Sequence, residues 1–333
     1  NSELFFTEVE MKVAKFGGSS LADANQIKKV CKIITSDPER KIIVVSAPGK
    51  RFKTDIKVTD MLIQCAEAML TTGNADKEVK DVIARFESIA NDLAMSSDII
   101  RVIYDDIMDR VNFSTEHKGK YIDNLKAAGE DNCAKLVAEY LNSIGIKAQY
   151  VSPKDAGLYL TESFGNARIL PESYENLGKL AHMDGIVVFP GFFGYTKNGN
   201  VVTFSRGGSD ITGSILAAAV NADLYENFTD VDCIYAVNPN LVENPTAITE
   251  LTYREMRELA YAGFSVFHEE ALTPVYYSNI PVNVKNTNNP SALGTTILPK
   301  LENPTRPVVG VAGDKGFCSI YVRKYLMNHE IGF

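Results

Sequence analysis

The chain has 333 residues, of which 45% are hydrophobic and none is tryptophan, and its formal net charge at pH 7 is −8. This composition is typical of a globular protein with one large core or two modest ones, and the acidic balance argues against a general nucleic-acid binder. The longest apolar runs, residues 42–45 and 186–189, are too short to cross a membrane, so we expect a cytoplasmic protein with a small ligand and no nucleic-acid or membrane partner.

The first predicted elements are a strand over residues 11–16 and a helix over residues 22–35, joined by a glycine turn. The turn reads Lys15-Phe16-Gly17-Gly18-Ser19-Ser20. Its amide groups and the positive amino end of the helix, capped by one of the serines or by Asp23, can point at an anion. The turn therefore suits a phosphate, although this segment alone is also compatible with an ordinary glycine turn beside a surface lysine.

A second strand is predicted over residues 41–47 and contains Ser46 near its carboxyl end, where open α/β sheets usually bind ligands. A basic loop over residues 51–57, to which we assign no role, leads to a helix from residue 59 or 60 to residue 70. Residues 76–112 are mainly helical and charged, which predicts a lid or a satellite helical layer with a solvated face.

A long amphipathic helix is predicted over residues 121–142, and Ala128-Gly129-Glu130 interrupts its pattern. A glycine within a helix costs stability, so a close approach of a ligand or of another backbone is expected there. Glu130 would then present a carboxylate to a ligand, and a solvated glutamate is the alternative.

The second half repeats the strand-and-glycine arrangement. A strand over residues 185–190 leads into Gly191-Phe192-Phe193-Gly194, and a strand over residues 201–204 leads into Ser205-Arg206-Gly207-Gly208-Ser209-Asp210. The latter run opens an alanine-rich helix over residues 211–220 and combines an arginine fork with two glycines. It predicts a second phosphate-type turn; the alternative is that Asp210 caps the helix and Arg206 is a surface charge.

Two further strands, over residues 224–228 and 280–284, flank a helix over residues 252–261. The first ends in Thr229-Asp230 with Tyr235 soon after, which fits a nucleotide pocket or, for the tyrosine, ordinary packing. The second ends in Lys285. The alternation of strands and helices predicts an α/β fold with a mostly parallel sheet, in which Lys15, Arg206 and Lys285 occupy equivalent strand ends.

Several known mechanisms are excluded by spacing. The chain has no P-loop pattern, no Rossmann glycine fingerprint opening a βαβ unit, no protein-kinase signature and no nucleophile elbow. Its five cysteines and four histidines show no zinc-ligand spacing, so no protein metal site is expected. Phosphoryl transfer by positioning and charge neutralisation is the remaining enzymatic interpretation.

Three segments together resemble the aspartate kinases of the amino acid kinase family: Lys15-Phe16-Gly17-Gly18-Ser19-Ser20, Ser205-Arg206-Gly207-Gly208-Ser209-Asp210 and Phe228-Thr229-Asp230-Val231-Asp232. Residues 255–263, 267–272 and 284–287 strengthen the resemblance, which covers about residues 11–299. It implies a three-layer αβα sandwich. It also implies transfer of the γ-phosphoryl group of ATP to the β-carboxylate of L-aspartate, the entry to lysine, threonine, methionine and isoleucine synthesis.

The resemblance also implies residue roles. Lys15 would contact the transferring phosphoryl oxygens and Asp210 would hold lysines in position, while Arg206 and Glu130 would bind the α-carboxylate and the ammonium of aspartate. The other expected substrate-binding residues are Ser46, Thr59 and Ser209. The expected nucleotide-binding residues are Gly17, Gly18, Ser19, Gly207, Gly208, Thr229, Asp230, Tyr235 and Lys285. Mg²⁺ is expected to arrive with ATP, held mainly by phosphate oxygens.

Two positions depart from the family's pattern: Cys233 stands at a usual glycine and Asn240 at a common arginine. Either Lys285 and Lys15 then neutralise more phosphate charge or another basic residue substitutes. The alternatives are another family member, acting on glutamate, N-acetylglutamate, carbamate or a nucleoside monophosphate, and a non-catalytic ligand-binding homologue. An N-acylated substrate would offer Glu130 no ammonium.

The predicted domains are a terminal tail over residues 1–10, a catalytic domain over residues 11–303, and the truncated start of an ACT-like regulatory domain over residues 304–333. Strand-like runs lie at residues 308–311 and 319–322. The resemblance implies a homodimer, with end-product amino acid effectors only where the full regulatory region is present. We therefore expect this 333-residue form to lack normal feedback control.

Overall fold

The computed structural model describes residues 11–239, 241–261, 269–301 and 307–313. Its central sheet consists of β1 (Lys12–Phe16), β2 (Arg40–Val45), β3 (Ala148–Tyr150), β4 (Ile186–Pro190), β7 (Leu224–Thr229), β10 (Glu250–Thr252), β11 (Val282–Asn286) and β12 (Thr295–Leu298). Within the described residues the strand order is β10-β12-β11-β7-β1-β2-β4-β3, and every pairing is parallel except that of β11 with β12. The predicted mostly parallel sheet is confirmed.

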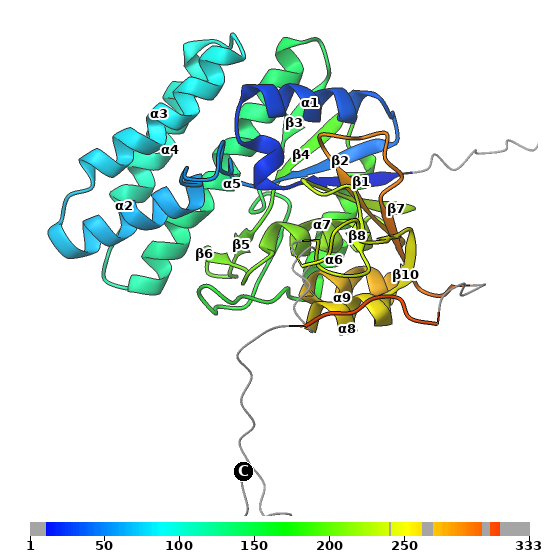
Figure 1. Cartoon of the computed structure of the whole chain (residues 1–333). Coiled ribbons are helices and arrows are strands. Elements are labelled where there is room, and N and C mark those ends of the chain that lie inside the picture. Colours follow the sequence, from blue (N-terminus) through cyan, green and yellow to red (C-terminus); the bar gives the residue numbers. More distant parts are fainter. Residues whose placement is uncertain (1–10, 240, 262–268, 302–306, 314–333) are drawn as a thin grey trace, which may run out of the picture.

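Helices cover both faces of this sheet (Figure 1). One face carries α1 (Ala24–Thr35), α2 (Val58–Thr72), α3 (Asp76–Asp92), α4 (Ser97–Val111) and α5 (Lys118–Ser143). The other carries α6 (Glu172–Gly178), α7 (Gly208–Ala219), α8 (Tyr253–Tyr261) and α9 (Glu269–Ser278). Because side chains alternate along a strand, Val44 packs in one core and its neighbours Ile43 and Val45 in the other. This is the predicted three-layer αβα sandwich.

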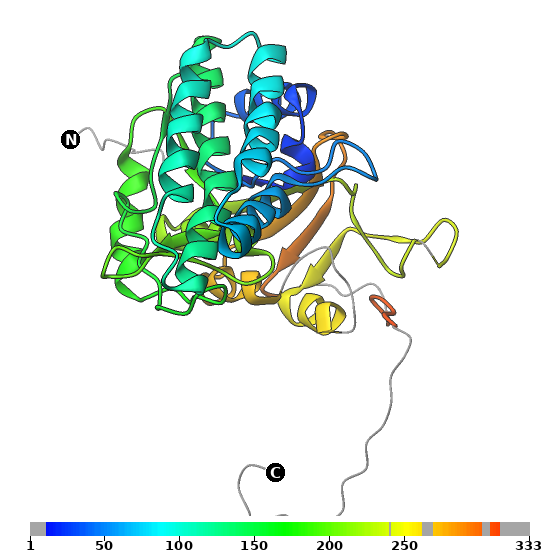
Figure 2. The same ribbon diagram turned by 90° about the vertical axis from the view of Figure 1, so that its left-hand side faces the viewer.

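The charged block over residues 76–112 forms the two helices α3 and α4, which line up with α2 and α5 in a helical layer (Figure 2). Val82 and Phe86 of α3 and Ile103 and Ile107 of α4 are buried in the same core as the sheet residues. The block is therefore an integral layer of the fold, with most of its charged side chains exposed and with Arg85 and Arg110 buried. None of the described helices combines the length and apolar character that crossing a membrane requires.

Helix α5 corrects one expectation, because it runs through Gly129 without a break. A Cβ on Gly129 would lie only 2.7 Å from the Cβ of Ala47, which follows β2. The glycine is thus explained by the close approach of helix and strand end, and the helix keeps its hydrogen bonds. This contact brings Glu130, the next residue of α5, to the edge where β2 ends.

A second correction concerns the strand before Arg206. Strand β6 (Val201–Thr203) pairs with β5 (Phe193–Tyr195) in an antiparallel hairpin outside the main sheet, so Arg206 does not occupy a strand end equivalent to those of Lys15 and Lys285. A three-residue strand carries no sequence signal for the sheet it joins.

At the carboxyl end, residues 308–311 are described and form no strand, contrary to the expectation. Residues 314–333, which include the run at 319–322, lie outside the described residues, as do residues 302–306. The ACT-like assignment of residues 304–333 stays a prediction.

We expect Gly129→Ala to lower the free energy of unfolding by about 1–3 kcal/mol, because the added methyl overpacks the contact with Ala47. Alanine's higher helix propensity would by itself raise the free energy of unfolding by about 1 kcal/mol, so a net loss of stability can be attributed to the overpacked contact. Urea denaturation measures the change. Ala47→Gly removes the colliding methyl, so the double variant should recover most of the loss; a Gly129→Ala protein as stable as the parent would contradict this packing.

Candidate active site

A cavity of about 740 Å³ lies at the edge where the parallel strands β1 and β2 end. All the predicted catalytic and substrate-binding residues line it. They are Lys15, Ser46, Thr59, Glu130, Arg206, Ser209 and Asp210. Of the predicted nucleotide-binding residues, Gly17, Gly18, Gly207 and Gly208 also line the cavity. Segments far apart in the sequence thus meet at one site.

Lys15 and Asp210 form the most tightly held charged pair of the cavity. The Lys15 Nζ lies 2.5 Å from the Asp210 Oδ1, and Lys15 is only 7% exposed. The amide of Asn227, on β7, donates a hydrogen bond to the same Asp210 oxygen at 2.7 Å, and its Oδ1 lies 3.4 Å from the lysine nitrogen. Because a buried ammonium needs a partner, Asp210 fixes the position of the Lys15 charge.

Backbone contacts shape the cavity wall. The Gly49 N–H donates to the Gly18 oxygen at 2.8 Å, and a Cβ on Gly49 would lie 2.5 Å from the Gly18 carbonyl carbon. On the other side, Gly207 has φ of +72° and a Cβ on Gly208 would lie 2.6 Å from the Phe192 ring. Both turns therefore need glycine, and Gly207 precedes the first turn of α7, whose amino end favours an anion.

Glu130 is a buried carboxylate, 5% exposed, and its Oε2 has no hydrogen-bond partner among the described residues. Burial raises the pKa of Glu130 to about 8, against the opposing effects of a backbone hydrogen bond from Ala47 and of the charges of Lys126 and Lys57. A cationic ligand group would satisfy this side chain and favour its ionised form. The alternative of a solvated glutamate is wrong.

Arg206 is exposed at the mouth of the cavity, and the described residues include no ion-pair partner for it. The hydroxyl of its neighbour Ser205 donates a hydrogen bond to the Glu270 carboxylate at 2.7 Å, which anchors the segment before α7. Because a guanidinium fork matches a carboxylate, Arg206 offers an anion site on the same cavity as the buried carboxyl group of Glu130.

The remaining predicted nucleotide-binding residues lie outside the lining of this cavity. Thr229 ends β7 and Lys285 lies on the neighbouring β11, with its Nζ 6.0 Å from the centre of the Phe228 ring. Asp230 follows Thr229, and Tyr235 lies in the short strand β8 (Ile234–Tyr235). Ser19 lies in the turn just after Gly18. Thr229 and Lys285 thus lie at the carboxyl edge of β7 and β11. This edge adjoins the glycine turn, since the Gly17 N–H donates to the Phe228 oxygen at 3.0 Å.

Several residues of the site were not predicted, among them Lys57, Lys126 and Asn227. Lys57 and Lys126 line the cavity, and Asn227 bonds to both members of the Lys15–Asp210 pair. The Lys126 Nζ lies 3.1 Å from the Thr203 hydroxyl and 5.2 Å from the centre of the Phe192 ring. Lys126 stands four residues before Glu130 on α5, so helical spacing could have found it. No local signal distinguishes Asn227, because its strand also contains Glu226 and Thr229.

Within the described ranges, no group of three or more His, Cys, Asp and Glu side chains is placed to hold a metal ion. Asn240, one of the two departures from the family's pattern, and residues 262–268 lie outside those ranges. Cys233 is buried.

Comparison with known proteins identifies the relatives of this chain. The model of the amino acid kinase family matches residues 10–286. Aspartokinase 3 of Bacillus subtilis (strain 168) is 59% identical over 323 residues, which are 97% of this chain and 71% of that protein.

Two solved structures are also similar. The aspartate kinase of Clostridium acetobutylicum is 40% identical with a TM-score of 0.78, and the match covers 91% of this chain. Escherichia coli aspartokinase III, in a complex with aspartate and ADP, is 28% identical with a TM-score of 0.77 over 89% of this chain. The chain spans 66% of the length of each of these two structures.

The raised pKa of Glu130 predicts a pH-dependent effect of Glu130→Gln. The folded protein holds this proton up to a pH of about 8, whereas the unfolded chain loses it near pH 4.5, so ionising the buried group destabilises the fold as pH rises. The variant's stability relative to the parent should therefore increase by about 1.4 kcal/mol per pH unit within that interval. Urea denaturation between pH 5.5 and 8 measures it, and a difference independent of pH would contradict the assignment.

Proposed function

This chain belongs to the amino acid kinase family and, within it, to the aspartokinases, and from that premise we propose that residues 11–303 form a catalytic domain that phosphorylates L-aspartate. The γ-phosphoryl group of ATP is transferred to the β-carboxylate, which gives 4-phospho-L-aspartate. The observation that carries the proposal is one cavity that holds a fixed lysine, an arginine with no ion-pair partner among the described residues, and a buried glutamate whose Oε2 accepts no hydrogen bond from them.

The charges of the cavity suit a small zwitterion that carries a second carboxylate, which stays free to react. Arg206 binds the α-carboxylate and Glu130 binds the ammonium, while Ser46, Thr59 and Ser209 supply hydrogen bonds around them. With both ends held, the β-carboxylate faces Lys15 at the glycine turn. This positioning supplies much of the rate acceleration, because the two reactants meet in a defined geometry.

Lys15 stabilises the negative charge on the phosphoryl group during transfer, and Asp210 with Asn227 keeps the ammonium in place. No general base is needed, since the attacking carboxylate is already ionised at neutral pH. Magnesium arrives as part of the substrate MgATP. Mg²⁺ usually keeps several waters and binds through substrate phosphates, and Asp210 is already paired with Lys15, so we propose that phosphate oxygens hold the metal.

The nucleotide lies along the adjoining edge of β7 and β11. Gly17, Gly18, Gly207 and Gly208 give its phosphates backbone room, with Ser19 at the amino end of the first helical turn. Lys285 neutralises phosphate charge, and Thr229, Asp230 and Tyr235 contact the adenosine. The homodimer, the cytoplasmic location and the loss of feedback control in this form stay predictions.

ATP turnover with trapping of the acyl phosphate by hydroxylamine tests the function. Aspartate should give the hydroxamate, whereas glutamate and N-acetylglutamate, the substrates of related kinases, should give little. The absence of hydroxamate with aspartate would contradict the proposed substrate. Hydroxamate with none of the three would favour a non-catalytic homologue.

Lys15→Ala should lower kcat by about two to three orders of magnitude with a modest change in the aspartate KM, because it removes charge stabilisation in the transition state. Lys12→Ala is the matched control: Lys12 lies on the same strand at its other end, where it pairs with Asp37 and Glu39. The control should keep the parent kcat. A normal kcat in Lys15→Ala would refute the assigned role.

Arg206→Ala should chiefly raise the aspartate KM, by about tenfold or more, because it removes an anchor used in both the ground state and the transition state. Steady-state kinetics at saturating MgATP measure the change. Arg257→Ala removes another exposed arginine, on α8, and should leave the aspartate KM unchanged. If the KM of Arg206→Ala equals that of the parent, Arg206 lies outside the aspartate pocket.

A further inference from the structure

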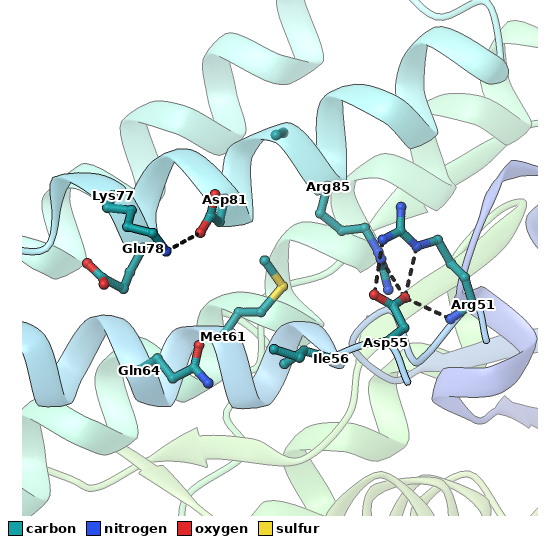
Figure 3. Close-up of a pocket in the computed structure, with 10 residues that line it drawn as sticks. Arg51, Asp55, Ile56, Met61, Gln64, Lys77, Glu78, Asp81 and Arg85 are labelled. Carbon is teal, nitrogen blue, oxygen red and sulfur yellow. Dashed lines mark hydrogen bonds and ion pairs between the residues drawn. The ribbon is translucent and has the colours of Figure 1, made fainter. Parts of the chain in front are cut away.

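Residues 48–57 belong to the loop that leads from β2 to α2. A buried arginine on another helix holds this loop through hydrogen bonds and an ion pair. Arg85 lies on α3 and is only 4% exposed. Its Nη2 donates a hydrogen bond to the Gly49 oxygen at 2.5 Å. Its Nη1 lies 2.8 Å from the Asp55 Oδ2, and Figure 3 shows the two side chains facing each other. One guanidinium therefore bridges the beginning and the end of the loop.

Asp55 completes this clasp, which we define as Arg51, Asp55 and Arg85. Its carboxylate accepts the Arg51 Nε–H at 2.8 Å and the Arg51 Nη2–H at 3.0 Å, while the Arg51 backbone N–H donates to the same group at 3.0 Å. These bonds, with the nearby Arg85, hold the pKa of Asp55 well below its usual range. Asp55 stays ionised at any physiological pH, so the clasp is permanent rather than pH-switched.

The loop that the clasp holds touches the candidate active site at both ends. Gly49 packs backbone to backbone on Gly18, and the Gly49 N–H donates to the Gly18 oxygen. At the other end of the loop, Lys57 and the neighbouring Thr59 line the cavity. Gly49 thus links Arg85, which donates to its carbonyl oxygen, to the proposed phosphate turn, which accepts from its N–H.

From this arrangement we propose that Arg85 is a positioning residue, which fixes the Gly18 turn for the nucleotide phosphates by holding the Gly49 carbonyl. This inference rests on the proposed function and adds a residue to it. Backbone amides bind phosphate well only when their directions are fixed in advance, and a displacement of about 1 Å at a reacting group costs up to 100-fold in rate. The long basic loop thereby acquires a role as the link between α3 and the site.

The geometry of the clasp predicts that the protein still folds without Arg85. Without Arg85, the Asp55 carboxylate keeps its two side-chain bonds to Arg51, so no bare charge is buried. A cavity of about 320 Å³ beside the clasp, lined also by Ile56, Met61 and Gln64, gives access to the vacated space (Figure 3). A free guanidinium ion can reach the position of the missing group.

The test compares MgADP affinity and ATP kinetics of Arg85→Ala with those of the parent. Calorimetry should give a MgADP Kd about tenfold higher, and kcat/KM for ATP should fall by about tenfold or more. Guanidinium at millimolar concentration should restore part of both in Arg85→Ala and neither in Lys15→Ala. Arg101→Ala, an equal change at an exposed arginine of α4, should match the parent.

Parent-like MgADP affinity and ATP kinetics in Arg85→Ala would overturn the positioning role. If Arg85→Ala does not fold, Arg85→Lys tests the proposal instead, because a lysine ammonium cannot bridge Gly49 and Asp55 as the arginine guanidinium does. A folded Arg85→Lys should bind MgADP several-fold more weakly, and parent-like binding would overturn the proposal. The hydroxamate assay on the parent protein tests a different claim. If the parent gives no hydroxamate with aspartate, the aspartate kinase function is contradicted, whereas the MgADP affinities of the variants still test the positioning role of Arg85.

Discussion

The ion pair between Lys15 and Asp210 is the interaction on which the site depends. It joins the end of β1 to the first turn of α7, two elements separated by most of the chain, and Asn227 of β7 bonds to both partners. A buried ammonium is stable only where its counter-charge is fixed, so the sheet and α7 must pack in one arrangement. The fold therefore delivers a cation to one defined point at the carboxyl edge of the sheet.

The two ends of the cavity differ in how their charges are satisfied. The proposed phosphate end is preorganised, with Lys15 already paired and the Gly18 turn hydrogen-bonded to the loop that Arg85 contacts. The proposed substrate end holds Arg206 without an ion-pair partner in the described residues and Glu130 with a raised pKa. A preorganised charge stabilises the transition state, whereas charged groups without partners favour the binding of a zwitterionic substrate.

Local sequence signals were sufficient for the strand-turn-helix units, because apolar periodicity and glycine turns are short-range features. The expectation that Lys15 and Asp210 belong to one site came from the family resemblance, and both residues line the same cavity. The features that could not be predicted depend on contacts between residues distant in sequence. Position 129 is a glycine because Ala47 packs closely against α5 there, and β6 belongs to a hairpin rather than to the main sheet. Asn227 was missed because β7 also contains Glu226 and Thr229, so one more polar residue in this strand gives no distinct local signal.

A crystal structure of this chain with aspartate and the magnesium complex of a non-hydrolysable ATP analogue tests the central claim most directly. The account predicts γ-phosphate oxygens about 3 Å from the Lys15 Nζ, with the aspartate β-carboxylate facing them and Arg206 on the α-carboxylate. A γ-phosphate held by other cations, with Lys15 paired only to Asp210 and remote from both ligands, would contradict it.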